Sequence, residues 1–165
     1  MKNIRKFFCT AWMLAAVSCS GGKLMKKLYE VESFINDRPD SALSVIRSID
    51  TLQLRTKAEK AKYSLLHAMA LDKNYIDTTD TRIIGPAVEY YSRHGSPEEK
   101  VKAYYHMGRI EYNGGNYNIA IVSLYKADVW SNEAHDLKQL GILYAEFGDT
   151  YTKTSEFSQA SVFIE

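Results

Sequence analysis

The chain has 165 residues, 45% of them hydrophobic and 25% charged, which suffices for the core of one globular domain but not of several. Its 21 basic and 20 acidic residues nearly cancel. A nucleic-acid-binding face needs concentrated positive charge, so we predict that this segment binds no nucleic acid.

The first 18 residues are predicted to be a secretory signal peptide. Three cations precede the apolar run of residues 7–17, which is shorter than the roughly 20 residues that a membrane-spanning helix needs. Removing residues 1–18 takes away three cations and no anion, so 21 basic and 20 acidic residues become 18 and 20, and the formal charge becomes −2.

The signal ends in Ala16-Val17-Ser18-Cys19, which resembles the lipobox of bacterial lipoproteins. The resemblance implies a lipid anchor on Cys19, with residues 19–23 as a flexible tether and an exported, membrane-bound protein of the cell envelope. No acidic cluster follows Cys19, which favours the periplasmic side over the cell surface. Cleavage nearby without lipidation is the alternative. Because Cys9 would leave with the signal, no disulfide within the chain is expected.

From residue 24 onward, apolar residues recur at intervals of three and four, which predicts an all-helical domain over residues 24–165. The first helix includes Leu24 to Ile35, and the second begins at Pro39, a residue that suits a helix start. The third helix covers about residues 56–74.

The next helix boundaries rest on capping signals. Residues 77–80 offer N-caps for a fourth helix that ends at Gly95, although Gly85-Pro86 predicts a late start or a bend. Ser96 and Glu99 form a capping box for the fifth helix. Later helices are predicted from Tyr117, over about residues 133–151, and from Ser155.

The predicted helices repeat in pairs. Four residues of the third pair recur 40 positions later in the fourth, with Tyr104, Gly108, Tyr117 and Ala120 matched by Tyr144, Gly148, Phe157 and Ala160. Small residues at such positions let two antiparallel helices approach closely. This pattern predicts a solenoid of about four antiparallel helix pairs.

These residues resemble the tetratricopeptide-repeat family. In the third unit the family pattern falls on Tyr104, Met107, Gly108, Gly115, Tyr117, Ala120 and Ala127. The resemblance implies an α-α superhelix that binds peptides on the concave face formed by the first helix of each pair. Together with the leader, it is similar to exported repeat lipoproteins of Bacteroidetes.

No motif for catalysis, metal binding or cofactor binding was found. The four histidines, at positions 67, 94, 106 and 135, lack paired-ligand spacing. Gly114-Gly115 lacks the lysine and serine of a phosphate loop, and residues 77–80 lack the glycine and glutamate of a calcium loop. We therefore expect neither enzymatic activity nor a cofactor.

The sequence favours a non-catalytic scaffold that binds a protein or peptide partner. One alternative is the N-terminal sensory part of a longer membrane-bound signalling or transcriptional regulator. A glycan-uptake lipoprotein ranks lower, because Trp130 is the only tryptophan after the signal. Apolar residues near the C-terminus predict that the domain continues into another helix or is covered by self-association.

Overall fold

A computed structural model describes the backbone of residues 19–162 and the side chains of residues 22–155. This part of the chain is all-helical and contains no strand. The α-helices are α1 (Cys19–Phe34), α2 (Pro39–Arg47), α3 (Lys57–Lys73), α4 (Gly85–His94), α5 (Pro97–Asn113), α6 (Tyr117–Ser131) and α7 (Leu137–Val162); two 3-10 turns are η1 (Thr51–Gln53) and η2 (Thr81–Ile83).

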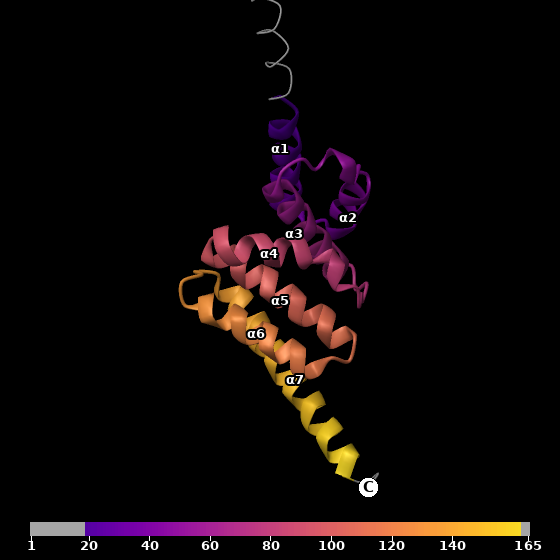
Figure 1. The fold of residues 1–165 in the computed structure, drawn as a ribbon, viewed down its shortest axis with the longest axis vertical. Coiled ribbons are helices and arrows are strands. Elements are labelled where there is room, and N and C mark those ends of the chain that lie inside the picture. The colour runs from indigo at the N-terminus through magenta and orange to yellow at the C-terminus, as the bar shows by residue number, and fades with distance from the viewer. Residues whose placement is uncertain (1–18, 163–165) are drawn as a thin grey trace, which may run out of the picture.

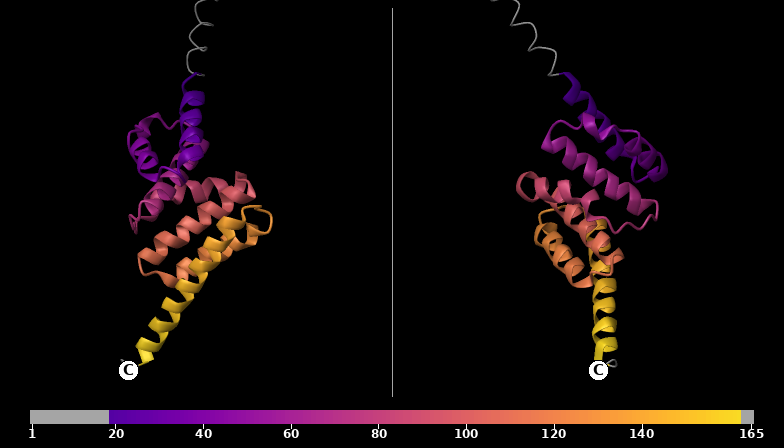
Figure 2. Two further views of the ribbon diagram at one scale, coloured as in Figure 1. Left: turned by 180° about the vertical axis from the view of Figure 1, so that it is seen from behind. Right: turned by 45° about the vertical axis from the view of Figure 1, so that its right-hand side comes forward.

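The helices stack in chain order from α1 to α7, and the second half of α7 projects beyond the rest of the domain (Figures 1 and 2). The odd-numbered helices contact one another in the order α1, α3, α5, α7, whereas no two even-numbered helices in the described part touch. Each even-numbered helix packs against the helices before and after it. The odd-numbered helices therefore form one continuous layer.

Three odd-numbered helices begin at a constant spacing of 40 residues, at Lys57, Pro97 and Leu137. Each start is set by a side-chain cap. Thr56 and Ser96 head complete capping boxes with Glu59 and Glu99, and the Asp136 carboxylate accepts from the Gln139 backbone N–H at 3.0 Å. Repeated capping chemistry thus fixes where each layer starts.

Gly108 is a point of close approach between α5 and α6, as predicted. A Cβ atom added there would lie 2.8 Å from Leu124 Cδ2 and 3.4 Å from the Ala120 carbonyl oxygen. Ala120 and Ala127 are buried, while Met107, Tyr104 and Tyr117 are partly buried. Tyr117 packs edge to face with Tyr112 across the turn, with ring centroids 5.4 Å apart.

Gly148, predicted to be the matching position, does not pack in this way. It is exposed, and nothing lies within 4 Å of an added Cβ atom. Tyr144 is likewise 54% exposed. The reason is that no helix covers this side of α7 in the described part of the chain. The side chains of Phe157 and Ala160 lie outside the described residues.

The expected eighth helix does not form within residues 19–162, because α7 runs without a break from Leu137 to Val162. The hydroxyls of Thr152, Thr154 and Ser155 donate to backbone carbonyls three or four residues earlier, which keeps this stretch helical. The described fold is therefore three helix pairs and one long single helix, and a fourth pair is not confirmed.

Two other boundaries differ in detail. The fourth helix starts late, at Gly85, with Pro86 in its first turn, while Asp80 caps η2 instead. The first helix already begins at Cys19, so residues 19–23, predicted to be a flexible tether, are helical. The predicted signal peptide, residues 1–18, lies outside the described residues, and so does the Cys19 side chain.

Candidate functional site

A groove crosses the layer of odd-numbered helices between α3, α5 and α7. It encloses about 100 Å³ and is lined by Asn36, Met69, Asp72, Lys73, Lys102, Tyr105, His106, Asp136, Lys138, Gln139 and Ile142. Apart from Asn36 and Asp136, all of these residues lie on the three helices. The groove therefore extends over three successive layers of the stack.

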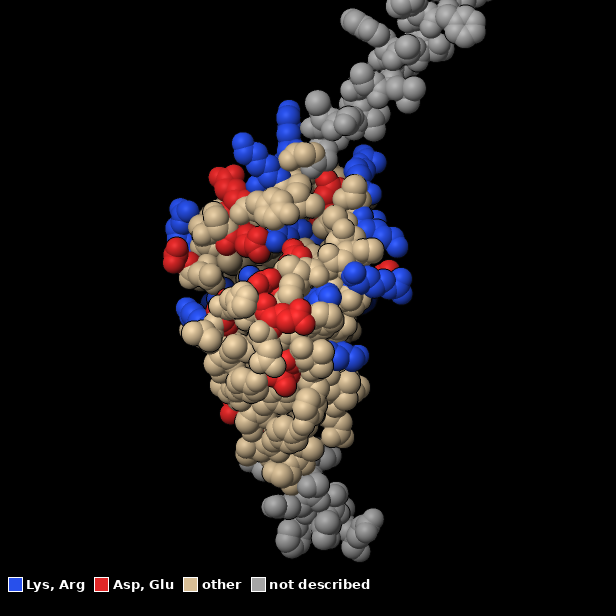
Figure 3. Space-filling model, turned by 90° about the vertical axis from the view of Figure 1, so that its left-hand side faces the viewer, with Lys and Arg blue, Asp and Glu red and all other residues tan. Residues whose placement is uncertain are grey.

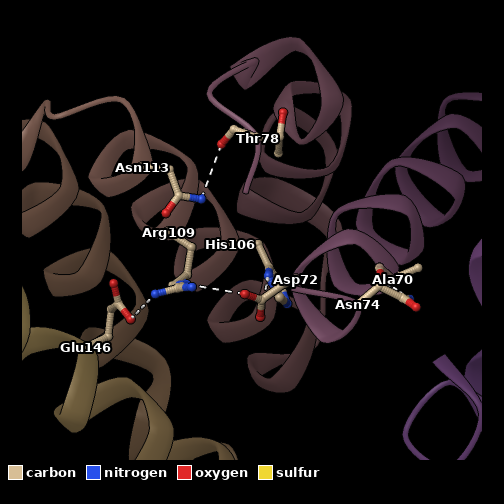
Figure 4. Close-up of polar contacts among 8 residues, drawn as sticks. All are labelled: Ala70, Asp72, Asn74, Thr78, His106, Arg109, Asn113 and Glu146. Atoms are coloured by element: carbon tan, nitrogen blue, oxygen red, sulfur yellow. Dashed lines mark hydrogen bonds and ion pairs between the residues drawn. The ribbon is translucent and has the colours of Figure 1, made fainter. Parts of the chain in front are cut away.

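An ion-pair ladder fixes one side of this groove (Figure 4). Arg109 on α5 donates from Nε to Asp72 of α3 at 3.3 Å and from Nη1 to Glu146 of α7 at 2.9 Å. Successive members are 37 residues apart. Since the helices start 40 residues apart, the ladder moves back by about one helical turn at each layer.

A second contact repeats between layers. The side-chain amide of Asn74, at the end of α3, donates to the Pro39 carbonyl at 2.8 Å. The amide of Asn113, at the end of α5, donates to the Thr78 carbonyl at 3.3 Å. Both bonds join residues 35 positions apart. The layers are thus tied at equivalent places, which sequence matching of apolar residues did not reveal.

A similar ladder joins α1, α3 and α5. The Lys62 ammonium lies 2.6 Å from a Glu32 carboxylate oxygen and 3.8 Å from one of Glu99, and its side chain is only 5% exposed. It also lies 4.9 Å from the centroid of the Tyr29 ring. In both ladders the central helix supplies the cation and the two outer helices supply the carboxylates.

The electrostatics of the first ladder follow from burial. Burial alone would lower the pKa of Arg109, but Glu146 and Asp72 outweigh it and raise that pKa. Burial raises the pKa of Glu146, although Arg109 opposes the shift. Burial also raises the pKa of Tyr105, with Asp72 and Glu146 adding to the effect. The groove wall is therefore a fixed, desolvated network.

Two buried polar atoms at this site have no hydrogen-bond partner among the described residues. They are Nε2 of Gln139 and Oε1 of Glu146. A buried donor without an acceptor costs about 1–3 kcal/mol. Gln139 occupies the capping-box position of α7, where Glu59 and Glu99 serve α3 and α5. Its amide nitrogen is thus an extra donor beside the groove.

His106 lies in the groove wall with its Nδ1 atom 3.8 Å from a carboxylate oxygen of Asp72. Burial lowers its pKa to about 4, although Asp72 opposes the shift. The folded chain therefore favours the neutral imidazole. Because the unfolded chain binds this proton more readily, stability from His106 is complete above its ordinary pKa, near 6.5, and is lost as the pH falls toward about 4.

We predict that His106→Gln reduces the acid sensitivity of folding between about pH 6.5 and pH 4. Denaturant unfolding at several pH values measures this difference, and His94→Gln is the control, since His94 is exposed. A proton NMR titration should show His106 still neutral at about pH 5.5. Protonation of His106 with a midpoint near its ordinary value of about 6.5 would contradict its burial.

The predicted concave-face tyrosines divide between two places. Tyr105 lines the groove, whereas Tyr125, Tyr144 and Tyr151 are about half exposed on α6 and α7. There the Tyr125 and Tyr151 hydroxyl oxygens lie 2.6 Å apart, and Tyr144 donates to Asp128 at 2.8 Å. Below the charged half of the face in Figure 3, the surface over these helices carries few charged side chains.

A larger hollow, of about 270 Å³, lies between α3 and α4. It is lined by Lys57, Lys60, Pro86, Glu89, Tyr90, Arg93 and His94. The pair between Lys57 and Glu89 is 3.9 Å long and highly exposed, so water screens its charges. This hollow lacks the buried, fixed polar groups of the groove between α3, α5 and α7.

Comparisons with protein-family profiles, with curated proteins and with solved structures found no significant match. Within the described part of the chain, no group of three or more His, Cys, Asp and Glu side chains is placed to hold a metal ion. No helix in that part is long and apolar enough to cross a bilayer.

Proposed function

We propose that this chain is a non-catalytic helical-repeat protein that binds an extended peptide segment of a partner in the groove between α3, α5 and α7. The unpaired Gln139 amide nitrogen is the observation that carries the proposal, because an extended peptide presents backbone carbonyls that accept such a bond. Lys73, Lys102 and Lys138 around the groove favour a partner segment with acidic residues.

The resemblance of the sequence to tetratricopeptide repeats supports the same function. It is favoured by the layer of odd-numbered helices, the 40-residue spacing of their starts and the close approach at Gly108. The ion-pair ladder holds the groove wall in place, which lowers the conformational cost of binding.

Site-specific photo-crosslinking in cells tests the groove. A photoreactive residue at Lys102 or Lys138 should give the same crosslinked partner, whereas one at exposed Lys126 on α6 should not. The product should diminish when Gln139→Leu removes the amide donor. Equal crosslinking from all three positions, or an unchanged product in Gln139→Leu, would contradict binding in this groove.

We also propose that the protein is exported and tethered by a lipid on Cys19. Mass spectrometry of the mature N-terminus should find an acylated cysteine at position 19. Cys19→Ala should move the protein from the membrane fraction to the soluble fraction, whereas the matched change Cys9→Ala should not. An unmodified mature N-terminus at another residue would overturn the anchor.

A further inference from the structure

The exposed side of α7 carries a regular stripe of residues. Leu137, Gly141, Tyr144, Gly148, Tyr151 and Ser155 follow one another at alternating intervals of four and three. All six are exposed. In the sequence, Ser158 and Val162 continue the same spacing. Alternation of four and three is the spacing by which one helix packs along another in a coiled coil.

The α7 stripe, meaning these six residues, offers room for a second helix. Nothing lies within 4 Å of a Cβ atom added at Gly141 or Gly148. The tyrosines between them are held by α6, through Tyr144 to Asp128 and through Tyr151 to Tyr125. The stripe is thus a firm surface in which large aromatic rings alternate with small residues.

We infer that this stripe is the contact between two copies of the chain, which pair through antiparallel α7 helices. A two-fold axis between residues 149 and 150 sets Tyr144 opposite Ser155 of the second copy and Gly148 opposite its Tyr151. Each large ring then faces a small residue, as close helix packing requires. A two-fold interface must be self-complementary in this manner, and the α7 stripe is.

Charge and shape agree with a second copy. No stripe residue is charged, and neither are Ala145 and Thr152, two exposed residues at the edge of the stripe that come to face each other across the pair. The centre of the contact therefore brings no like charges together. The second half of α7 projects from the domain in every view (Figures 1 and 2). In the antiparallel pair, this half lies beside the first half of the other α7.

The exposed area indicates a weak dimer. Leu137, Tyr144 and Tyr151 are 82%, 54% and 45% exposed. Since an aromatic side chain buries about 150–250 Å² when fully covered, these three offer about 300 Å² per copy. Symmetry doubles that area, and flanking residues bring it toward the roughly 1,200 Å² at the lower end of specific interfaces. Association should therefore depend on concentration.

Sedimentation velocity over a concentration series tests the pairing, with the chain of residues 19–165 carrying Cys19→Ser. We expect a monomer–dimer equilibrium. Gly148→Leu should weaken the dimer by about tenfold or more, because the added side chain overlaps the ring of the opposite Tyr151. Asp149→Leu is the matched control, since it adds the same side chain one residue along, away from the stripe, and should leave the dimer intact.

Disulfide formation tests the direction of the helices. When Tyr144→Cys and Ser155→Cys proteins are mixed, a heterodimeric crosslink should form, and neither protein should crosslink to itself. Ser155→Tyr gives a second blocking variant, and circular dichroism checks that each variant is folded. A monomer at all concentrations, equal dimerisation of Gly148→Leu and Asp149→Leu, or crosslinking of Tyr144→Cys to itself would overturn the inference.

Discussion

Gly108→Leu should unfold at a clearly lower denaturant concentration than the parent chain, with a loss of about 1–3 kcal/mol. Even the first added carbon would lie 2.8 Å from Leu124 Cδ2, and the Ala120 carbonyl behind it belongs to the backbone of α6. The two helices must therefore separate to admit the side chain. Denaturant unfolding followed by circular dichroism measures the loss.

Gly148→Leu provides the matched control, because Gly148 lies 40 residues later at the equivalent position of α7 but faces open space. At concentrations where the chain is monomeric, this change should leave stability equal or raise it by up to about 1 kcal/mol, since glycine is a poor helix former. If Gly108→Leu and Gly148→Leu had the same unfolding midpoint, the close contact between α5 and α6 would be refuted.

Arg109→Met should destabilise the fold by about 3 kcal/mol at neutral pH, the low end of the range for breaking a buried ion pair. The Glu146 side chain is only 6% exposed, whereas Arg109 and Asp72 are 25% and 27% exposed, which moderates the loss. Arg82→Met is the control, because the Arg82 side chain is 90% exposed in its pair with Asp80. It should change stability little.

The loss in Arg109→Met should shrink as the pH falls. The pKa of Glu146 is already raised by burial, and Arg109 is the group that opposes this shift. Removing Arg109 raises the pKa further, so ionised Glu146 costs the folded chain more at neutral pH. This cost disappears once Glu146 is protonated. A loss that stayed constant from about pH 7 to about pH 4.5 would contradict the assigned role of Glu146.

The helix boundaries that the sequence predicted well are those with local chemical signals. Ser96 and Glu99 form the expected capping box, and Pro39 stands in the first turn of α2. Local signals failed at Ser155, since a serine that could cap a new helix also bonds within an existing one. No glycine breaks the chain there, unlike Gly115, which adopts a φ of 75° between α5 and α6.

The groove was harder to predict than the helices. Matching of apolar residues gave the spacing of 40, but the ladder residues Asp72, Arg109 and Glu146 are spaced by 37, because their side chains meet diagonally across the layers. One available signal was overlooked. Thr56, Ser96 and Asp136 are each followed three residues later by Glu, Glu and Gln, which marks the start of all three groove helices.

The two ladders overlap, and this has a consequence for how the domain comes apart. Stacked repeats are commonly treated as a row of units in which each senses only its immediate neighbours, so terminal units can melt independently. Here Lys62 links α1, α3 and α5, while Arg109 links α3, α5 and α7. Detachment of α7 would strip Arg109 of one carboxylate, and detachment of α1 would do the same to Lys62. Both ends are therefore tied energetically to α3 and α5, which favours a single concerted melting transition over stepwise fraying.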